Sequence, residues 1–314
     1  MQKFPDKDYK LFKDLVSLKQ EDLKILLSKF LKKYYKDNII ETEEYIVGIG
    51  NIPIALVAHM DTVFETPPEH IYFDEKKWVF WSPEGLGADD RAGVYMILKI
   101  LLKGYLPTVI FTTDEEIGGM GALQLIRDFP DPPMELKYLI QLDRHGFNDA
   151  VFYDCTNKDF IDYIETFDFI EEDGIFSDIS IICPAWNLAG VNLSVGYLNE
   201  HSYLETLSMS VTKKTLERVI LMLEEADTQI TYDFGEELYD RFYWYSYNLK
   251  CDSCGKVFYD YEMIPVELED GTMKHFCSDC SVDKVTWCKI CDQSMLIDKT
   301  KPNQKICYRH KNVH

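Results

Sequence analysis

Three stretches decide the fold of this 314-residue chain: residues 54–62 (IALVAHMDT), residues 108–119 (TVIFTTDEEIGG) and residues 138–143 (YLIQLD). Each contains a short apolar run of the kind that forms a buried strand, and each run ends in acidic or histidine side chains. Apolar residues at helical spacing predict helices between these runs, over residues 91–102 and 121–127. This alternation of strands and helices predicts an α/β sandwich around a mixed sheet.

The remaining segments extend the pattern. Residues 7–36 carry Leu, Phe and Tyr at helical spacing and predict one or two amphipathic helices in a helical N-terminal segment, residues 1–40. Strands at residues 44–48 and 52–58 predict a β-hairpin that turns at Gly50-Asn51. The other expected elements are a hairpin over residues 71–81, strands at residues 150–153, 179–182 and 190–195, and a long helix over residues 211–226.

The charge distribution excludes one class of ligand for the larger part of the chain. The sequence carries 33 basic and 54 acidic side chains, a net charge of −21, and its last 65 residues hold ten of each sign. The acidic excess therefore lies in residues 1–249, and an acidic surface repels phosphate backbones. No apolar run reaches the roughly 18 residues of a membrane span, and residues 1–15 lack the apolar core of a secretory signal. We expect a cytoplasmic protein that does not bind membranes.

Chemically active side chains cluster where the predicted strands end. His59 and Asp61 follow the first strand, and their two-residue spacing points both to one side. Glu115 and Glu116 follow the second strand, and Asp143 ends the third. Ligands of open α/β sheets collect at the carboxyl ends of strands. A histidine that binds a metal also needs a group that fixes its tautomer, which the Asp61 carboxylate can supply.

Two further blocks complete a familiar pattern. Residues 85–93 (GLGADDRAG) form a glycine-rich turn that opens a helix, and residues 199–205 (NEHSYLE) bring His201 and Glu205 ahead of the last helix. The blocks AHMDTV, GLGADDRAG, FTTDEEIGGMGA, the Asp after YLIQL, and NEHSYLE resemble, in the same order, those of the co-catalytic di-zinc exopeptidases of clan MH. That superfamily includes peptidase T, carboxypeptidase G and bacterial leucyl aminopeptidases. The resemblance covers roughly residues 45–227.

The resemblance implies a reaction and a role for each motif residue. It implies hydrolysis of amide or peptide bonds by an exopeptidase of the aminopeptidase type, through a hydroxide that bridges two metals. Glu115 would be the general base, and Asp61 would orient the histidine two positions before it. Zinc is the expected catalytic metal, and cobalt or manganese can take its place. The implied ligands are His59 and Asp143 on one ion, Glu116 and His201 on the other, and Asp89 bridging both.

The sequence departs from part of that superfamily in one respect. Peptidase T and carboxypeptidase G types carry a lid or dimerisation domain between the fourth and fifth ligand blocks, but here Asp143 and His201 are only 58 positions apart. We therefore expect a phosphorylase/hydrolase-like sandwich without a lid, as in the compact aminopeptidases. Residues 174–200 are expected to line the pocket, where Ser177-Asp178 either contacts a substrate amine or caps a helix.

Residues 250–314 predict a separate zinc-binding module, joined to a hydrolase domain (residues 1–230) by an aromatic connector (residues 231–249). Seven of the nine cysteines lie in this module. Pairs with two residues between them, in a chain without a secretory signal, favour metal over disulfides. Ligands paired in chain order would form two zinc-ribbon-like sites, and cross-braced pairing is the alternative. The eight ligands are Cys251, Cys254, Cys277, Cys280, Cys288, Cys291, Cys307 and His310.

Three hypotheses follow for the whole chain. The first is a zinc-dependent peptidase with two catalytic and two structural zinc ions, acting on a peptide or small amide. The second is a deacylase of N-acyl amino acids that uses the same metals. The third is a zinc-ribbon binding protein with an inactive hydrolase domain. The sequence argues against this hypothesis, because all five implied catalytic ligands and Glu115 are present. The zinc module has no excess of positive charge, so we expect a protein partner or substrate contact ahead of nucleic acid. The oligomeric state and the substrate stay open.

Overall fold

The computed structural model describes residues 6–235, 248–255, 257–259, 263–268, 272–291 and 293–297. The chain divides into two compact units, residues 1–238 and residues 239–314. Within these described ranges, no helix is both long and apolar enough to cross a membrane.

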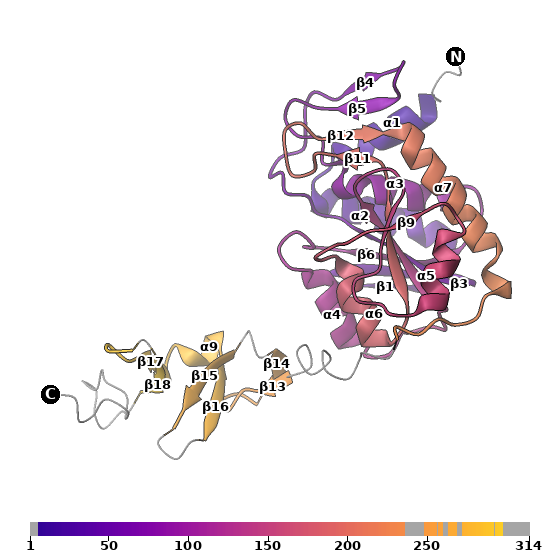
Figure 1. The fold of residues 1–314 in the computed structure, drawn as a ribbon. Helices are drawn as coiled ribbons and strands as arrows, with labels where there is room; N and C mark the ends of the chain where they lie inside the picture. Colours follow the sequence, from indigo (N-terminus) through magenta and orange to yellow (C-terminus); the bar gives the residue numbers. More distant parts are fainter. Residues whose placement is uncertain are drawn as a thin grey trace. The chain divides into compact units, whose positions relative to one another are not determined.

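The first unit is built on an eight-stranded mixed sheet with the strand order β1-β2-β6-β3-β7-β10-β8-β9 (Figure 1). The four central strands β6, β3, β7 and β10 run parallel, and antiparallel or short strands flank them. Parallel strands place their carboxyl ends at one edge of the sheet, which is where the predicted ligand blocks follow. In sheet order the strands are Ile39–Glu41, Tyr45–Gly48, Pro107–Thr112, Ile52–His59, Tyr138–Arg144, Gly190–Ser194, Asp149–Val151 and Ile170–Glu171.

Helices cover both faces of this sheet. Helices α3 (Ala88–Leu102) and α7 (Met209–Glu224) pack together on one face, and α4 (Met120–Asp128) and α6 (Asp178–Trp186) pack together on the other (Figure 1). Central strands covered on both faces are largely apolar and buried along their length, as the runs IALVA of β3 and VIF of β6 are. The expected mixed α/β sandwich is therefore confirmed. The remaining helices of the unit are α1 (Asp6–Val16), α2 (Gln20–Tyr35), α5 (Lys158–Glu165) and the short η1 (Ala226–Thr228).

The hairpin expected over residues 44–58 is wrong, although both of its strands exist. Strand β6 lies between β2 and β3, pairing antiparallel with β2 and parallel with β3. The connection at Gly50 instead wraps around the start of β6, where Asn51 N donates to Leu106 O at 2.9 Å. A side chain at Gly50 would meet the Leu106 carbonyl oxygen at 2.0 Å, so this close crossing requires glycine. The hairpin over residues 71–81 is confirmed as β4 (Tyr72–Asp74) and β5 (Val79–Trp81).

The strand expected at residues 179–182 is also wrong, because these residues lie in helix α6. The run Ile179-Ser180-Ile181-Ile182 has the β-branched composition of a strand, but Ser177 precedes it as the N-cap residue. Ser180 Oγ accepts a bond from Ser177 N at 3.4 Å, which helps to start the helix. The apolar side chains are buried against the sheet, so tertiary packing overrides the local propensity for a strand.

A second sheet with the order β11-β12-β5-β4 lies beside the main one, with β11 at Tyr197–Leu198 and β12 at Thr206–Ser208. Its side chain Phe80 packs on Phe12 of α1, with ring centroids 4.8 Å apart, and Phe12 is fully buried. Such aromatic contacts bury large apolar areas. The predicted N-terminal helices therefore belong to the core of the first unit.

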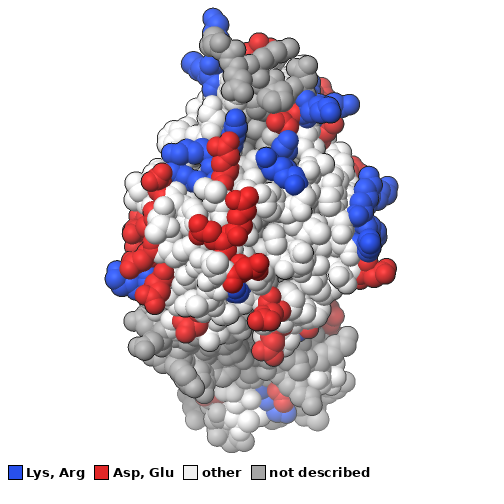
Figure 2. Space-filling view, turned by 90° about the vertical axis from the view of Figure 1, so that its right-hand side faces the viewer, with Lys and Arg blue, Asp and Glu red and all other residues white. Residues whose placement is uncertain are grey.

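The start of the aromatic connector packs against the first unit. Tyr232 and Phe234 are buried, and Ala189 N donates to Tyr232 O at 2.9 Å. The rest of the connector, residues 236–247, lies outside the described residues. On the face of the molecule shown in Figure 2, the acidic and basic side chains that are described intermingle, without a continuous basic band.

The described residues of the second unit form three short hairpins and one helical turn. The hairpins are β13–β14 (Asn248–Lys250, Val257–Tyr259), β15–β16 (Met263–Glu267, Met273–Cys277) and β17–β18 (Val285–Trp287, Ser294–Leu296), and α9 spans Ser278–Ser281. Its apolar clusters are small and are built around cysteines: Cys251, Met263 and Cys277 form one, Cys288 and Met295 another. Such small cores need a metal or another cross-link for stability.

The packing of the main sheet makes one stability prediction. Leu56 lies in the middle of β3 and is fully buried, so Leu56→Ala should lower the free energy of unfolding of the first unit by about 2–5 kcal/mol. Leu102→Ala is the matched control, because Leu102 is 53% exposed at the end of α3. Urea unfolding followed by circular dichroism measures both. Equal unfolding midpoints for the two variants would contradict the assignment of β3 to the core.

Candidate functional site

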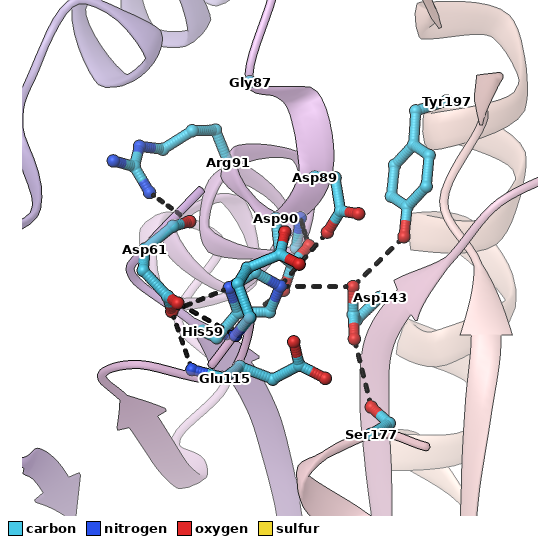
Figure 3. A network of polar contacts seen from close by, with 12 residues as sticks. His59, Asp61, Gly87, Asp89, Asp90, Arg91, Glu115, Asp143, Ser177 and Tyr197 are labelled. Carbon is cyan, nitrogen blue, oxygen red and sulfur yellow. Dashed lines mark hydrogen bonds and ion pairs between the residues drawn. The ribbon is translucent and has the colours of Figure 1, made fainter. Parts of the chain in front are cut away.

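The carboxyl edge of the main sheet gathers the side chains that the sequence singled out (Figure 3). His59 ends β3, Asp143 lies near the end of β7, and Glu115 and Glu116 follow β6. These three strands are parallel neighbours, with β3 in the centre. Four side chains from three distant stretches of the sequence therefore meet at one place.

Asp89 reaches the same place from the first turn of α3. Gly93 lets this turn approach β7, because a side chain there would meet Leu142 O at 2.2 Å. The neighbouring Asp90 holds the turn in position: its Oδ1 accepts from Gly93 N at 2.8 Å and its Oδ2 from His59 N at 3.3 Å. Asp90 also lies within reach of a cation held by His59 and Asp143, but backbone groups occupy both of its oxygens. We therefore assign Asp90 a structural role.

The two carboxylate oxygens of Asp89 face two different histidines. Oδ1 lies 3.1 Å from His59 Nε2, and Oδ2 lies 3.0 Å from His201 Nε2. Asp89 is buried, whereas the side chain of His201 is 51% exposed, so the site opens to solvent on the His201 side. One carboxylate between two imidazoles is the arrangement that a shared ligand of two cations requires.

Two more carboxylates lie beside these histidines and complete two groups of three side chains. The first group is His59, Asp89 and Asp143, and the second is His201, Asp89 and Glu116. Asp143 Oδ1 lies 3.5 Å from His59 Nε2, and Glu116 Oε2 lies 3.1 Å from His201 Nε2. Ligand atoms at roughly 2.1 Å from a tetrahedral ion lie roughly 3.4 Å from one another, so the distances from each histidine to its two carboxylates are close to those within a coordination shell. His59, Asp89 and Glu116 also have ligand atoms that all lie within 4.8 Å of one another. Glu116 Oε1 is buried without any hydrogen-bond partner, which a cation would supply. The donor set of imidazole and carboxylate therefore fits two divalent cations.

The pKa shifts within the cluster also favour the binding of cations. Burial, together with the charge of Asp89, raises the pKa of Glu116 to about 7 and raises the pKa of Asp143 above its usual range. Burial opposes a charge on His59, but the carboxylates of Asp143, Asp61 and Asp89 raise its pKa well above the ordinary value. Carboxylates crowded away from water repel one another unless positive charge lies between them. Divalent cations would supply that charge.

Asp61 ties His59 to the loop that carries the glutamates. Its Oδ1 lies 3.1 Å from His59 Nδ1, which leaves Nε2 free to bind a cation. The same carboxylate accepts from Glu115 N at 3.1 Å and from Glu116 N at 3.0 Å. Asp61 therefore orients the imidazole, as the resemblance implies, and also fixes the turn after β6.

Glu115 precedes Glu116 in the chain, but its carboxylate forms no ion pair with His59 or His201. It is 9% exposed, and burial followed by the charges of Asp143 and Asp178 raises its pKa to about 9. A carboxyl group with so high a pKa holds its proton near neutral pH, and it could accept a proton from water only where nearby positive charge, such as that of bound divalent cations, lowers its pKa. Its position is the one expected for a general base.

The sequence reasoning named Glu205 and Ser177 but gave neither a role in holding a ligand, and it did not single out Tyr197. The carboxylate of Glu205, which is fully buried, accepts from Gly87 N at 2.6 Å and from Asp89 N at 3.0 Å, so it holds the backbone of the bridging residue. Tyr197 donates to Asp143 Oδ1 at 3.1 Å, and Ser177 donates to Asp143 Oδ2 at 3.0 Å. A glutamate four positions after a ligand histidine was the available signal for Glu205. Nothing in the sequence pairs Tyr197 with Asp143.

The pocket residues expected from residues 174–200 are only partly in place. Ser177 is the helix N-cap residue and contacts Asp143, whereas Asp178 is fully buried and accepts from Thr112 Oγ1 at 2.5 Å. The capping alternative therefore holds for Ser177. The cavity that opens beside the cluster is lined by other parts of the chain, namely Val16, residues 18–21, 61–68 and 86–87, Arg91, Asp114 and residues 116–117.

The second unit holds a cluster of four thiols that fits a metal ion: Cys251, Cys254, Cys277 and Cys280, with all four sulfur atoms within 4.8 Å of one another. Sulfur atoms at roughly 2.3 Å from a tetrahedral zinc ion lie roughly 3.8 Å apart, close to the 4.0 Å between Cys254 Sγ and Cys277 Sγ. The first two cysteine pairs are therefore brought together in chain order. Of the predicted second site, Cys288 and Cys291 are described, but Cys307 and His310 lie outside the described residues.

No protein-family profile and no curated protein sequence matches the chain, whereas solved structures do. The first unit is similar to the aminopeptidase PepT of Bacillus cereus (TM-score 0.52, 16% identity, 72% of this chain and 99% of that one). A tripeptidase of Staphylococcus aureus has a TM-score of 0.56 at 14% identity, covering 73% of this chain and 100% of its own. The TET1 peptidase of Pyrococcus horikoshii has a TM-score of 0.53 at 13% identity, with 69% of this chain and 99% of that one covered. The chain has the fold of these peptidases. The fold implied by the resemblance to di-zinc exopeptidases is thus confirmed.

The metal centre makes a prediction about metal content. Asp89→Ala should remove two metal ions per chain relative to the wild type, because both groups lose their shared ligand. Asp227→Ala is the matched control, since Asp227 is exposed and distant in sequence from every ligand block, and it should change nothing. Elemental analysis of zinc-dialysed proteins counts the ions. An Asp89→Ala variant that keeps the wild-type metal content would rule out the shared ligand.

Proposed function

We propose that the first unit is a metal-dependent hydrolase of amide or peptide bonds. The observation that supports this most strongly is the Asp89 carboxylate, whose two oxygens each face a different histidine at about 3 Å. Three carboxylates, those of Asp89, Asp143 and Glu116, would neutralise most of the charge of two divalent cations. Zinc is the metal we propose, with cobalt or manganese as alternatives at the same ligands.

The side chains divide the chemistry among them. Two bound cations would lower the pKa of a water molecule between them and polarise the carbonyl group under attack. Glu115 would take the proton of the attacking water and pass it to the leaving amine. Asp61 keeps His59 in the tautomer that presents Nε2, and Glu205 keeps the backbone of Asp89 in place. The half-exposed His201 marks the side from which a substrate enters.

We further propose that the substrate is cut at a chain end. The structural neighbours named above are an aminopeptidase, a tripeptidase and a TET1 peptidase, which supports an exopeptidase. A deacylase of N-acyl amino acids would use the same metal ligands and the same base. The second unit would then have a structural role through its zinc sites, and its partner, if it has one, would be a protein.

The role of Glu115 gives the central functional prediction. Glu115→Gln should lower kcat/KM by roughly 10²–10⁴-fold, because the amide cannot accept the proton, while fold and metal content stay unchanged. The assay is a screen of aminoacyl, dipeptide and N-acyl substrates with zinc or cobalt added, together with circular dichroism and elemental analysis.

Glu165→Gln is the matched control for this experiment, because Glu165 is exposed at the end of α5. It should hydrolyse as the wild type does. Full activity of Glu115→Gln would disprove the mechanism, and preference for N-acyl substrates over free aminoacyl substrates would select the deacylase.

A further inference from the structure

The carboxylate of Glu115 has no bonds that fix its position directly. Within the described parts of the chain it forms no hydrogen bond or ion pair, and in Figure 3 the dashed line to Glu115 ends at its backbone nitrogen. Its position next to the proposed ligand Glu116 is therefore set by the backbone of the turn that follows β6, residues 113–116. A group that holds this turn also holds Glu115.

Side chains from other elements bind three successive backbone N–H groups of this turn. Asp61 accepts from Glu115 N and Glu116 N, and Gln20 Oε1 accepts from Asp114 N at 3.3 Å. Gln20 Nε2 also donates to Asp114 Oδ1 at 3.1 Å, so one amide binds both the backbone and the side chain of Asp114. Asp114 has a φ of 57°, in the left-handed region, where a residue other than glycine persists only when its surroundings hold it. The paired bonds from Gln20 supply that hold.

Gln20 is the first residue of α2, which lies outside the sheet that carries the ligands. The chain just before it is fixed by Arg91, which is buried and donates to Leu18 O at 3.1 Å. The same guanidinium donates to the carbonyl oxygens of Met60 and Asp61. Arg91 therefore ties the turn between α1 and α2 to the end of β3, and Gln20 reaches the glutamate turn from a fixed start.

A polar stripe on α2 also fixes the helix beside the sheet. Gln20, Lys24 and Ser28 recur every four residues, so they lie on one face of the helix. Lys24 Nζ donates to Thr42 O at 2.5 Å, and Ser28 Oγ donates to Glu41 Oε2 at 2.7 Å. The face that carries Gln20 therefore docks α2 against β1 and the residue that follows it.

We propose that Gln20 is a positioning residue for hydrolysis: its amide holds Asp114 in the left-handed conformation and so directs the Glu115 carboxylate toward the attacking water. This rests on the proposed function, in which Glu115 is the base. A carboxamide carries a donor and an acceptor together, which match the carboxylate and the N–H group of Asp114. A carboxylate at position 20 has no donor and repels Asp114. The N-terminal helices thus contribute to catalysis as well as to the core.

The test compares steady-state kinetics of full-length, zinc-loaded variants on the substrate that the wild type hydrolyses fastest. Gln20→Glu should lower kcat about tenfold and leave KM within about twofold, because the base is misplaced while substrate binding is not changed. Adding Asp114→Asn to Gln20→Glu should restore kcat to within about threefold of the wild type, because the amide and the carboxylate have exchanged places and both bonds can form again.

Gln124→Ala is the matched control. Gln124 Nε2 donates to Asp128 Oδ1 at 3.0 Å within α4, a glutamine–aspartate bond of the same kind between two residues that are not proposed ligands. Its kcat and KM should equal those of the wild type. A wild-type kcat in Gln20→Glu, or a loss that Asp114→Asn does not restore although metal content and circular dichroism are unchanged, would overturn the proposal.

Hydrogen–deuterium exchange separates this proposal from the proposed function. In Gln20→Ala the backbone N–H of Asp114 loses its acceptor, so a fragment that contains residues 113–116 should exchange about tenfold faster than in the wild type, while a fragment from β3 exchanges as before. That result supports the hold on the turn even if the wild type hydrolyses nothing, in which case only the proposed function fails. Unchanged exchange of residues 113–116 overturns the proposal whatever the activity.

Discussion

The carboxylate of Asp89, held between the imidazoles of His59 and His201, is the interaction on which the rest of the site depends. It can stand there because β3, β6 and β7 end at one edge of the sheet and because Gly93 lets α3 approach β7 closely. Without positive charge between them, the buried carboxylates around it would repel one another, as the raised pKa values of Glu116 and Asp143 indicate. Two divalent cations would relieve that repulsion and would also supply the chemistry proposed for the site.

Three of the five proposed ligands, His59, Asp89 and Asp143, are in turn held by groups that are not themselves proposed ligands. Asp61 orients His59, Glu205 binds the backbone around Asp89, and Tyr197 and Ser177 donate to Asp143. Such supporting bonds fix the ligands before a metal binds and so reduce the cost of reorganisation. The N-terminal helices take part as well, because Arg91 and Gln20 connect their turn to the loops of the site. The geometry of the site therefore depends on the N-terminal helices as well as on the main sheet.

The sequence predicted the strand ends and the ligand blocks because both are local signals: an apolar run followed by polar residues. It could not predict which strands pair, so the hairpin over residues 44–58 was wrong, because β6, which begins 48 positions after the end of β3, lies between its two strands. The helix at α6 was taken for a strand because its isoleucines favour β structure and only packing decides otherwise. The cavity wall at residues 18–21 depends on bonds from Arg91 and Gln20 to distant loops, which no local pattern reveals.

Anomalous X-ray diffraction at the zinc edge, on crystals of the zinc-loaded full-length protein, tests the central claim most directly. The account predicts two zinc peaks in the first unit, roughly 3.5–4 Å apart, one on each side of the Asp89 carboxylate. One peak would lie against His59 and Asp143, and the other against His201 and Glu116. A single peak, or two peaks of which only one contacts Asp89, would contradict it.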